Sequence, residues 1–242
     1  MKTIYKTIVL LSLCVVIFSC RQEKPTKSTE IYLLLDVTAS AENSNKLNIN
    51  AQKVANISGL NDNEKTLQLT YSHSTLSEVF INGVFSRTLM PAKQKGYNKF
   101  RRRNAIKEYL KSIDEEIAKL NSVEFDRPNS NLFVNINSTI NKVAKNNADN
   151  QLVLIQSDLL DNSSLFSAYD SEQMLKLKKS PAFLINILEQ HAPINQSLDK
   201  MDVIIVYQPI AKTDEAYRLI SSIFKDYLIS KNAKSVQIVA NL

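Results

Sequence analysis

The sequence places a carboxylate and two hydroxyls at alternate positions directly after an apolar run. The run is IYLLL at 31–35, and the polar residues are Asp36, Thr38 and Ser40. Successive side chains of an extended segment point to opposite sides, so these three lie on the same side and can face one ion. Hard cations such as Mg²⁺ take oxygen ligands and usually keep several waters. The pattern therefore predicts a divalent-metal site.

Two more polar segments occupy comparable positions. Ser130 lies just before a helical pattern at 131–146, and Asp158 follows the apolar run 152–155. In open α/β sheets, ligands bind beyond the carboxyl ends of the strands. We therefore expect Ser130 and Asp158 to converge with the first group above one edge of a sheet.

The elements that must position these residues alternate between apolar strands and amphipathic helices. This order predicts an α/β fold: a doubly wound, mainly parallel, six-stranded sheet with helices on both faces. The expected strands are 31–35, 66–71, 77–86, 152–155, 203–207 and 236–239. The expected helices are 43–58, 100–121, 131–146, 171–190 with a break at Pro181, and a last one capped by Thr213 that runs to about 230. The pair 66–71 and 77–86 is expected to be antiparallel at the sheet edge.

The N-terminal segment is set apart from the fold. Lys2 and Lys6 precede an apolar stretch, which ends in Ile17-Phe18-Ser19-Cys20 and resembles a bacterial lipobox. The resemblance implies a lipoprotein signal peptide over 1–19, cleavage before Cys20 and lipidation of its thiol. Residues 20–29 are then the lipidated cysteine and a flexible tether, and 30–242 form one domain. The expected location is the bacterial cell envelope, outside the cytoplasm and anchored to a membrane.

Composition excludes several other classes. Only 3 glycines occur, and neither glycine-rich phosphate-loop motif is present, which disfavours nucleotide binding. The net charge of +6 is mild and does not indicate nucleic acid. The only cysteines are Cys14 and Cys20, and Cys14 lies in the expected signal peptide. The mature chain therefore cannot form an internal disulfide, and its core alone must stabilise it.

The three polar segments together resemble the von Willebrand factor type A (vWA) domain with its metal-ion-dependent adhesion site. That family carries D-x-S-x-S after its first strand, a Thr at the start of a helix and an Asp after its fourth strand. The matching residues here are Asp36, Thr38, Ser40, Ser130 and Asp158. The chain departs from the family at Asn129 and Leu159, where glycine is common.

The resemblance implies a docking site and no enzyme activity. The matching residues would bind Mg²⁺ (or Mn²⁺ or Ca²⁺), and the ion would accept a Glu or Asp carboxylate from a partner protein. Two alternatives stay open: a metal-dependent hydrolase that uses Asp36 and Asp158, and a metal-free scaffold domain. The sequence does not indicate the oligomeric state.

Two other features are expected to be structural. The basic run between Lys93 and Lys107, with Arg101, Arg102 and Arg103 at its centre, favours a solvated helix face. Anionic lipid headgroups, a polysaccharide or an acidic partner are the alternative contacts. His73 and His191 lack nearby metal-ligand spacing and are expected to be surface or cap residues.

Overall fold

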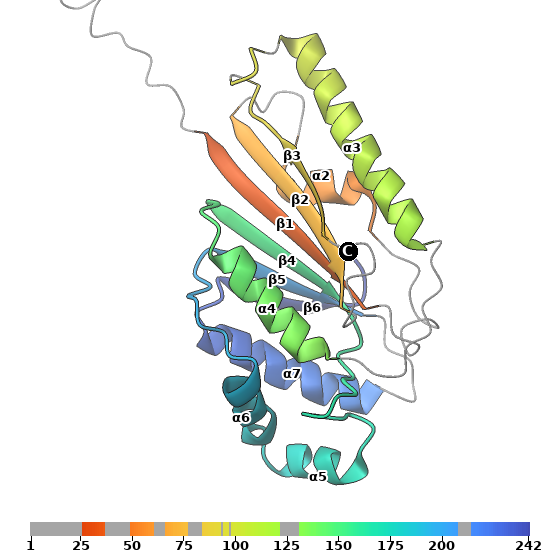
Figure 1. Cartoon of the computed structure of the whole chain (residues 1–242), viewed down its shortest axis with the longest axis vertical. Helices are drawn as coiled ribbons and strands as arrows, with labels where there is room; N and C mark the ends of the chain where they lie inside the picture. Colours follow the sequence, from red (N-terminus) through yellow and green to blue (C-terminus); the bar gives the residue numbers. More distant parts are fainter. Residues whose placement is uncertain are drawn as a thin grey trace, which may run out of the picture.

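A six-stranded sheet runs through the molecule in the order β3-β2-β1-β4-β5-β6 (Figure 1). The computed structural model describes residues 26–36, 49–60, 66–76, 84–92, 94–96, 98–121, 131–207 and 214–242. The strands are β1 (Lys27–Leu35), β2 (Leu67–Thr75), β3 (Phe85–Leu89), β4 (Asn150–Gln156), β5 (Met201–Val206) and β6 (Ser235–Val239). All neighbouring strands are parallel except β2 and β3, which are antiparallel. The predicted fold class is confirmed.

Two layers of helices cover the sheet, one on each face. The helices are α2 (Ala51–Ser58), α3 (Lys99–Asn121), α4 (Leu132–Ala144), α5 (Ser171–Lys179), α6 (Ala182–His191) and α7 (Asp214–Ser230). Residues Ile31, Leu33 and Leu35 of β1 pack in the core beneath α2 and α3. Residues Tyr32 and Leu34 pack in the opposite core beneath the other four helices. Burial on both faces explains why the first strand reads as a continuous apolar run.

The helices follow the sequence pattern closely. The expected helix at 171–190 divides into α5 and α6 on either side of Pro181, since proline cannot donate the backbone hydrogen bond that a helix interior needs. Helix α2 covers the second half of the expected helix at 43–58, and Asn50 caps it by accepting a hydrogen bond from the Lys53 amide. Residues 43–48 and the expected cap Thr213 lie outside the described residues.

Two strand boundaries differ from expectation. The strand expected at 77–86 pairs instead over Phe85–Leu89, and residues 77–83 lie outside the described part of the chain. Strand β1 begins at Lys27, so residues 27–29, which were assigned to the tether, belong to the sheet. Their register opposite Leu67 to Leu69 of β2 accounts for this extension.

Two residues that were expected at the surface are buried. Arg102 is 2% exposed, and its guanidinium donates to the carbonyls of Met90 and Leu67 at 2.7 and 3.5 Å. His73 is 4% exposed in β2, and its ring stacks on Phe85 with centroids 5.0 Å apart. Burial lowers the pKa of His73 to about 4, so the ring is neutral at pH 7. A solvated face for Arg102 and a surface role for His73 are therefore wrong.

Within the described ranges, no helix has both the length and the apolar character that a membrane crossing would require.

Candidate functional site

The candidate site lies at the carboxyl ends of β1 and β4, where the strand order reverses. From β1 the sheet extends to β2 and β3 on one side and to β4, β5 and β6 on the other. The last residues of the two strands, Leu35 and Gln156, pair directly, and the Asp36 amide donates to the Gln156 carbonyl at 2.9 Å. Doubly wound sheets bind ligands in the crevice at this reversal. The segments that carry Asp36 and Asp158 therefore leave the sheet side by side.

A short hydrogen bond joins these two segments. The Ser157 hydroxyl donates to Asp36 Oδ2 at 2.6 Å and accepts from the Leu159 amide at 2.9 Å. Ser157 is 2% exposed, while Asp36 is only partly buried. The hydroxyl is thus held from one side by its own loop and orients the Asp36 carboxylate from the other. A charge-assisted O–H···O⁻ bond of this length is among the stronger kinds in proteins.

Asp158 lies deeper than Asp36 and organises the loop after β4. Its side chain is 2% exposed, and Oδ1 accepts from the Leu160 amide at 2.9 Å. Burial, the nearby Tyr207 and the Asp158 carboxylate together raise the pKa of Tyr217 to about 12. The Tyr207 and Tyr217 rings lie 4.7 Å apart between centroids. An aspartate therefore lies close to two buried tyrosines whose rings are in contact.

Leu159 adopts a backbone conformation that favours glycine. Its φ is +55°, in the left-handed region, although its side chain is fully buried in the core with α4 to α7. A non-glycine residue in this region costs about 1–2 kcal/mol. The loop after β4 therefore makes a left-handed turn at a leucine. Packing of the Leu159 side chain in the core offsets the strain of this turn.

Asp161 connects this loop to the start of α4. Its Oδ1 accepts from the Leu132 amide at 3.1 Å, and its Oδ2 accepts from the Ser163 hydroxyl at 3.1 Å. Asn131 is the residue before the helix, and its side chain does not cap it. A carboxylate at a helix N-terminus is favoured by the helix dipole. Asp161 thus fixes the first turn of α4 against the loop after β4.

The end of β2 is tied to the same corner. The Leu76 amide donates to the Leu35 carbonyl at 2.7 Å, and Asn135 of α4 donates to the Leu76 carbonyl at 2.8 Å. Three strands and one helix therefore meet within a few residues of Asp36. This arrangement gives the site a rigid base.

The structure describes two residues of the predicted set. Asp36 follows β1 and Asp158 follows β4, its parallel neighbour in the sheet. Thr38, Ser40 and Ser130 lie outside the described residues, as does Cys20. Ser130 is two positions before Leu132, whose amide contacts Asp161, so the chain enters α4 beside the Asp158 loop.

Sequence reasoning missed two residues of the site. Ser157 had the signal of a hydroxyl at a strand end, but its contact with Asp36 joins residues 121 positions apart. Asp161 caps a helix that begins 29 positions earlier. Neither contact leaves a local pattern in the sequence.

The side chains at this corner that could bind a metal ion all offer oxygen atoms as ligands. Carboxylates and hydroxyls of this kind suit hard cations, whereas soft metals prefer thiolates and imidazoles. In the described ranges, no group of three or more His, Cys, Asp or Glu side chains gathers closely enough to hold an ion. The ligands predicted from the sequence, Thr38, Ser40 and Ser130, are hydroxyls that lie outside those ranges.

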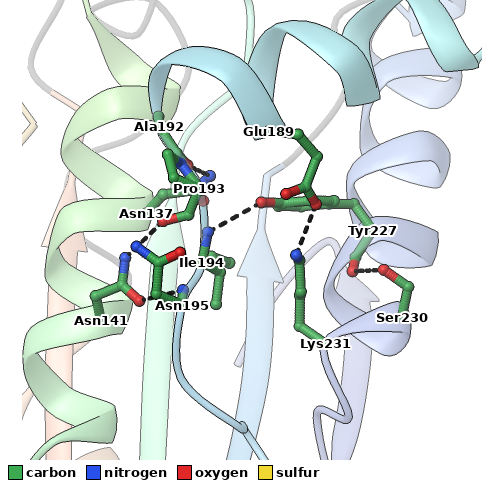
Figure 2. A network of polar contacts seen from close by, with 10 residues as sticks. All are labelled: Asn137, Asn141, Glu189, Ala192, Pro193, Ile194, Asn195, Tyr227, Ser230 and Lys231. Carbon is green, nitrogen blue, oxygen red and sulfur yellow. Dashed lines mark hydrogen bonds and ion pairs between the residues drawn. The ribbon is translucent and has the colours of Figure 1, made fainter.

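A hollow also lies between α4 and the end of α6. It is open, with a volume of about 600 Å³, and its lining includes Lys142, Lys145 and His191. At one side of it, Asn137 and Asn141 donate to the carbonyls of Ala192 and Pro193 at 2.7 and 2.8 Å (Figure 2).

The chain next to this hollow is also held from α7. The Tyr227 hydroxyl accepts from the Ile194 amide at 3.2 Å, and Lys231 pairs with Glu189 at 2.6 Å (Figure 2). These side chains satisfy backbone groups and hold the segment after α6 in place. We therefore assign the network to the fold and the candidate site to the corner at Asp36.

Comparison with known proteins gives distant similarity only. The human COPII-coat protein Sec24c aligns with a TM-score of 0.49 and 9% identity, over 91% of this chain and 30% of that chain. The D319A mutant of the PilB minor pilin from Streptococcus sanguinis aligns with a TM-score of 0.45 and 7% identity, over 91% of this chain and 59% of that chain. This chain thus spans less than two thirds of either protein. No protein-family model and no curated protein matches it.

The sheet topology and the corner at Asp36 define a class of protein. The chain contains a doubly wound α/β domain with an antiparallel edge strand and a serine–aspartate hydrogen bond at its switch point.

Proposed function

We propose that this chain is a lipid-anchored protein of the bacterial cell envelope whose vWA-like domain docks a partner protein through a divalent cation. The cation, Mg²⁺ or a similar hard ion, would be held by residues of the three loops at the switch point. These residues are Asp36, Thr38, Ser40, Ser130 and Asp158. The partner would contribute a Glu or Asp carboxylate, and Cys20 would carry the lipid.

The hydrogen bond from Ser157 to Asp36 Oδ2 carries this proposal. It links the two loops that flank the strand reversal and orients the one carboxylate of the D-x-T-x-S segment. The left-handed turn at Leu159 and the Asp161 contact with Leu132 add support, because they hold the loop after β4 against the start of α4.

In this proposal, some residues bind the cation and others hold the binding residues in position. When bound, the cation would offer an electrophilic coordination position to a carboxylate oxygen. Asp36 supplies negative charge, and Ser157 holds its orientation. Asp158 is engaged with the Leu160 amide on one oxygen, which places it as a buried supporting group below the exposed surface.

The hydrolase alternative receives less support. The histidines that could serve as general bases lie elsewhere, His73 against Phe85 in β2 and His191 at the end of α6. The scaffold alternative makes the same corner purely structural, and metal affinity separates it from the docking proposal.

Calorimetric titration of the purified chain with MgCl₂ and MnCl₂ tests the proposal. We expect one saturable site in the wild type and no measurable heat in Asp36→Ala. Asp170→Ala is the matched control: Asp170 is an exposed aspartate whose carboxylate caps α5 by accepting from the Glu172 and Gln173 amides. It should bind the metal as the wild type does.

Equal, negligible heats in all three proteins would refute the metal site and leave the scaffold alternative. Partner docking is tested separately by pull-down from solubilised envelope, with and without chelator. A partner that is retained equally in both conditions would refute metal-mediated docking.

A further inference from the structure

The first turn of α3 lies at the end of the sheet where the chain enters the domain. Arg102 of this turn donates to the carbonyl of Leu67, and Leu67 pairs with Lys27, the first residue of β1. Figure 1 shows the start of α3 and the start of β1 at the same end of the molecule. The candidate site at Asp36 lies at the other end of β1.

This end carries an exposed aromatic ring surrounded in sequence by exposed cations. Phe100 is 78% exposed, the highest value among the exposed large hydrophobic residues of the described chain. We define the basic–aromatic patch as Lys95, Lys99, Phe100, Arg101 and Arg103, all of them exposed. Between residues 91 and 107 the sequence has seven basic residues and no acidic one. The patch therefore has a single sign of charge.

The patch is unfavourable for an isolated domain. Burying a phenylalanine is worth about 1.5–3 kcal/mol, which Phe100 forgoes. Cations in the first turn of a helix oppose its dipole, at about 0.3–1 kcal/mol each. Arg102 of the same turn is buried and bonded to backbone carbonyls, whereas Arg101 and Arg103 are exposed. Exposed Phe and Lys/Arg together are the composition that binds the interface of an anionic bilayer.

The length of the tether brings this end close to the proposed anchor. Seven residue steps separate Cys20 from Lys27, and a fully extended chain spans at most about 3.6 Å per residue. The start of β1 therefore lies within about 25 Å of a lipidated Cys20. Leu67 is the neighbour of Lys27 in the sheet and the contact of Arg102, so the patch lies close to the same point.

We propose that the basic–aromatic patch binds the anionic headgroups of the membrane that holds the anchor, with Phe100 inserted at the interface. This inference rests on the lipid anchor of the proposed function but not on its metal site. It sets the orientation of the domain. The amino end of the sheet faces the bilayer, and Asp36 faces away, at the far end of a strand about 30 Å long.

Tryptophan fluorescence tests this inference, because the chain has no tryptophan of its own. Phe100→Trp places a single probe in the patch. Tyr169→Trp is the matched control, since Tyr169 is also exposed, at 57%, and follows Ala168, whose amide binds the Asp161 carbonyl near the site. The full-length chain is reconstituted with phosphatidylcholine vesicles that contain phosphatidylglycerol and brominated acyl chains. Co-sedimentation of the chain with the vesicles reports the anchor independently.

The expected result is a blue-shifted and strongly quenched emission for Phe100→Trp and unquenched emission for Tyr169→Trp. In the Phe100→Trp background, changing Lys95, Lys99, Arg101 and Arg103 to Gln should remove most of the quenching. Arg102 stays unchanged because it belongs to the fold. Vesicles of phosphatidylcholine alone should likewise lose most of the quenching, since the cations then lack anionic partners.

Each other outcome overturns the inference. Sedimentation without quenching at position 100 means that the anchor holds but the patch does not touch the membrane. Equal quenching of both probes means that the domain has no preferred orientation. A chain that sediments with no vesicle, even purely anionic ones, refutes both the anchor and the patch.

Discussion

The substitution Asp161→Ala tests the hydrogen bond that connects the loop after β4 to the start of α4. It removes the acceptor of the Leu132 amide, which is buried at the start of the helix. Loss of an N-terminal cap costs about 1 kcal/mol at an ordinary helix end. Because the Leu132 amide is buried, the cost rises toward the ~1–3 kcal/mol of a buried donor left without a partner. The Ser163 hydroxyl also loses one partner but keeps its bond to the Phe166 carbonyl. We therefore expect the free energy of unfolding to fall by about 1–3 kcal/mol.

Urea denaturation measures this loss, with chelator present so that bound metal does not contribute. At a slope of about 2–3 kcal/mol per molar urea, the midpoint should fall by about 1 M. Asp161→Asn keeps an oxygen acceptor and loses only the charge, so it should lose about 1 kcal/mol. Asp170→Ala is the control with the same chemistry. It removes the cap of α5, whose carboxylate accepts from two amides at the surface, where water can replace it.

The three variants should differ in their free energy of unfolding. Asp161→Ala should be the least stable, Asp161→Asn should follow, and Asp170→Ala should be closest to the wild type. Equal losses for the two alanine variants would refute the assignment of Asp161 as a buried joint. The Asp161→Ala variant should also bind Mg²⁺ more weakly, because it loosens the start of α4 from the loop after β4.

Three further outcomes are expected. Ser157→Ala should weaken Mg²⁺ binding about 10–100-fold in calorimetry, as loss of a group that orients a ligand does, and unchanged affinity would count against the role of its hydroxyl. His73 has a folded pKa of about 4, below its ordinary 6.5. Its neutral form therefore stabilises the fold above pH 6.5, and about 2–3 kcal/mol should be lost as the pH falls from 6.5 to 4. The difference in unfolding free energy between wild type and His73→Phe isolates this term, and a difference that does not vary with pH would contradict it. Cys20→Ala should abolish incorporation of a fatty-acid analogue, and a labelled variant would exclude Cys20 as the lipid site.

The sheet and its helices could be predicted from the sequence because each element buries a regular apolar face. The central strands are continuous apolar runs, and the break at Pro181 follows from proline chemistry. The edge strand was placed too early because several apolar residues precede Phe85, and alternation alone does not fix the register of an edge strand. Pairing with β2 decides where β3 begins.

Two of the missed burials did leave a signal in the sequence. Arg102 stands four positions before Ile106, on the stripe that continues through Tyr109 and Ile113, all of them buried. His73 continues the alternation of Leu69 and Tyr71 on one face of β2. Both residues were predicted to be exposed because they are charged or polar. Their positions in the helical and strand periodicity indicated burial. The contacts of Ser157 and Asp161 are different, because they join distant loops and depend on the folded topology.

The position of β1 has a mechanical consequence. A tether that leaves at Lys27 and a partner held beside Asp36 would pull on opposite ends of this one strand. The strand is the middle of the sheet, and it is paired along its length with β2 and over seven residues with β4. A load along the strand axis is shared by all these hydrogen bonds at once, in shear, so they cannot break one after another from an end. With the proposed anchor and partner in place, β1 would therefore carry tension along its axis without its pairing opening from either end.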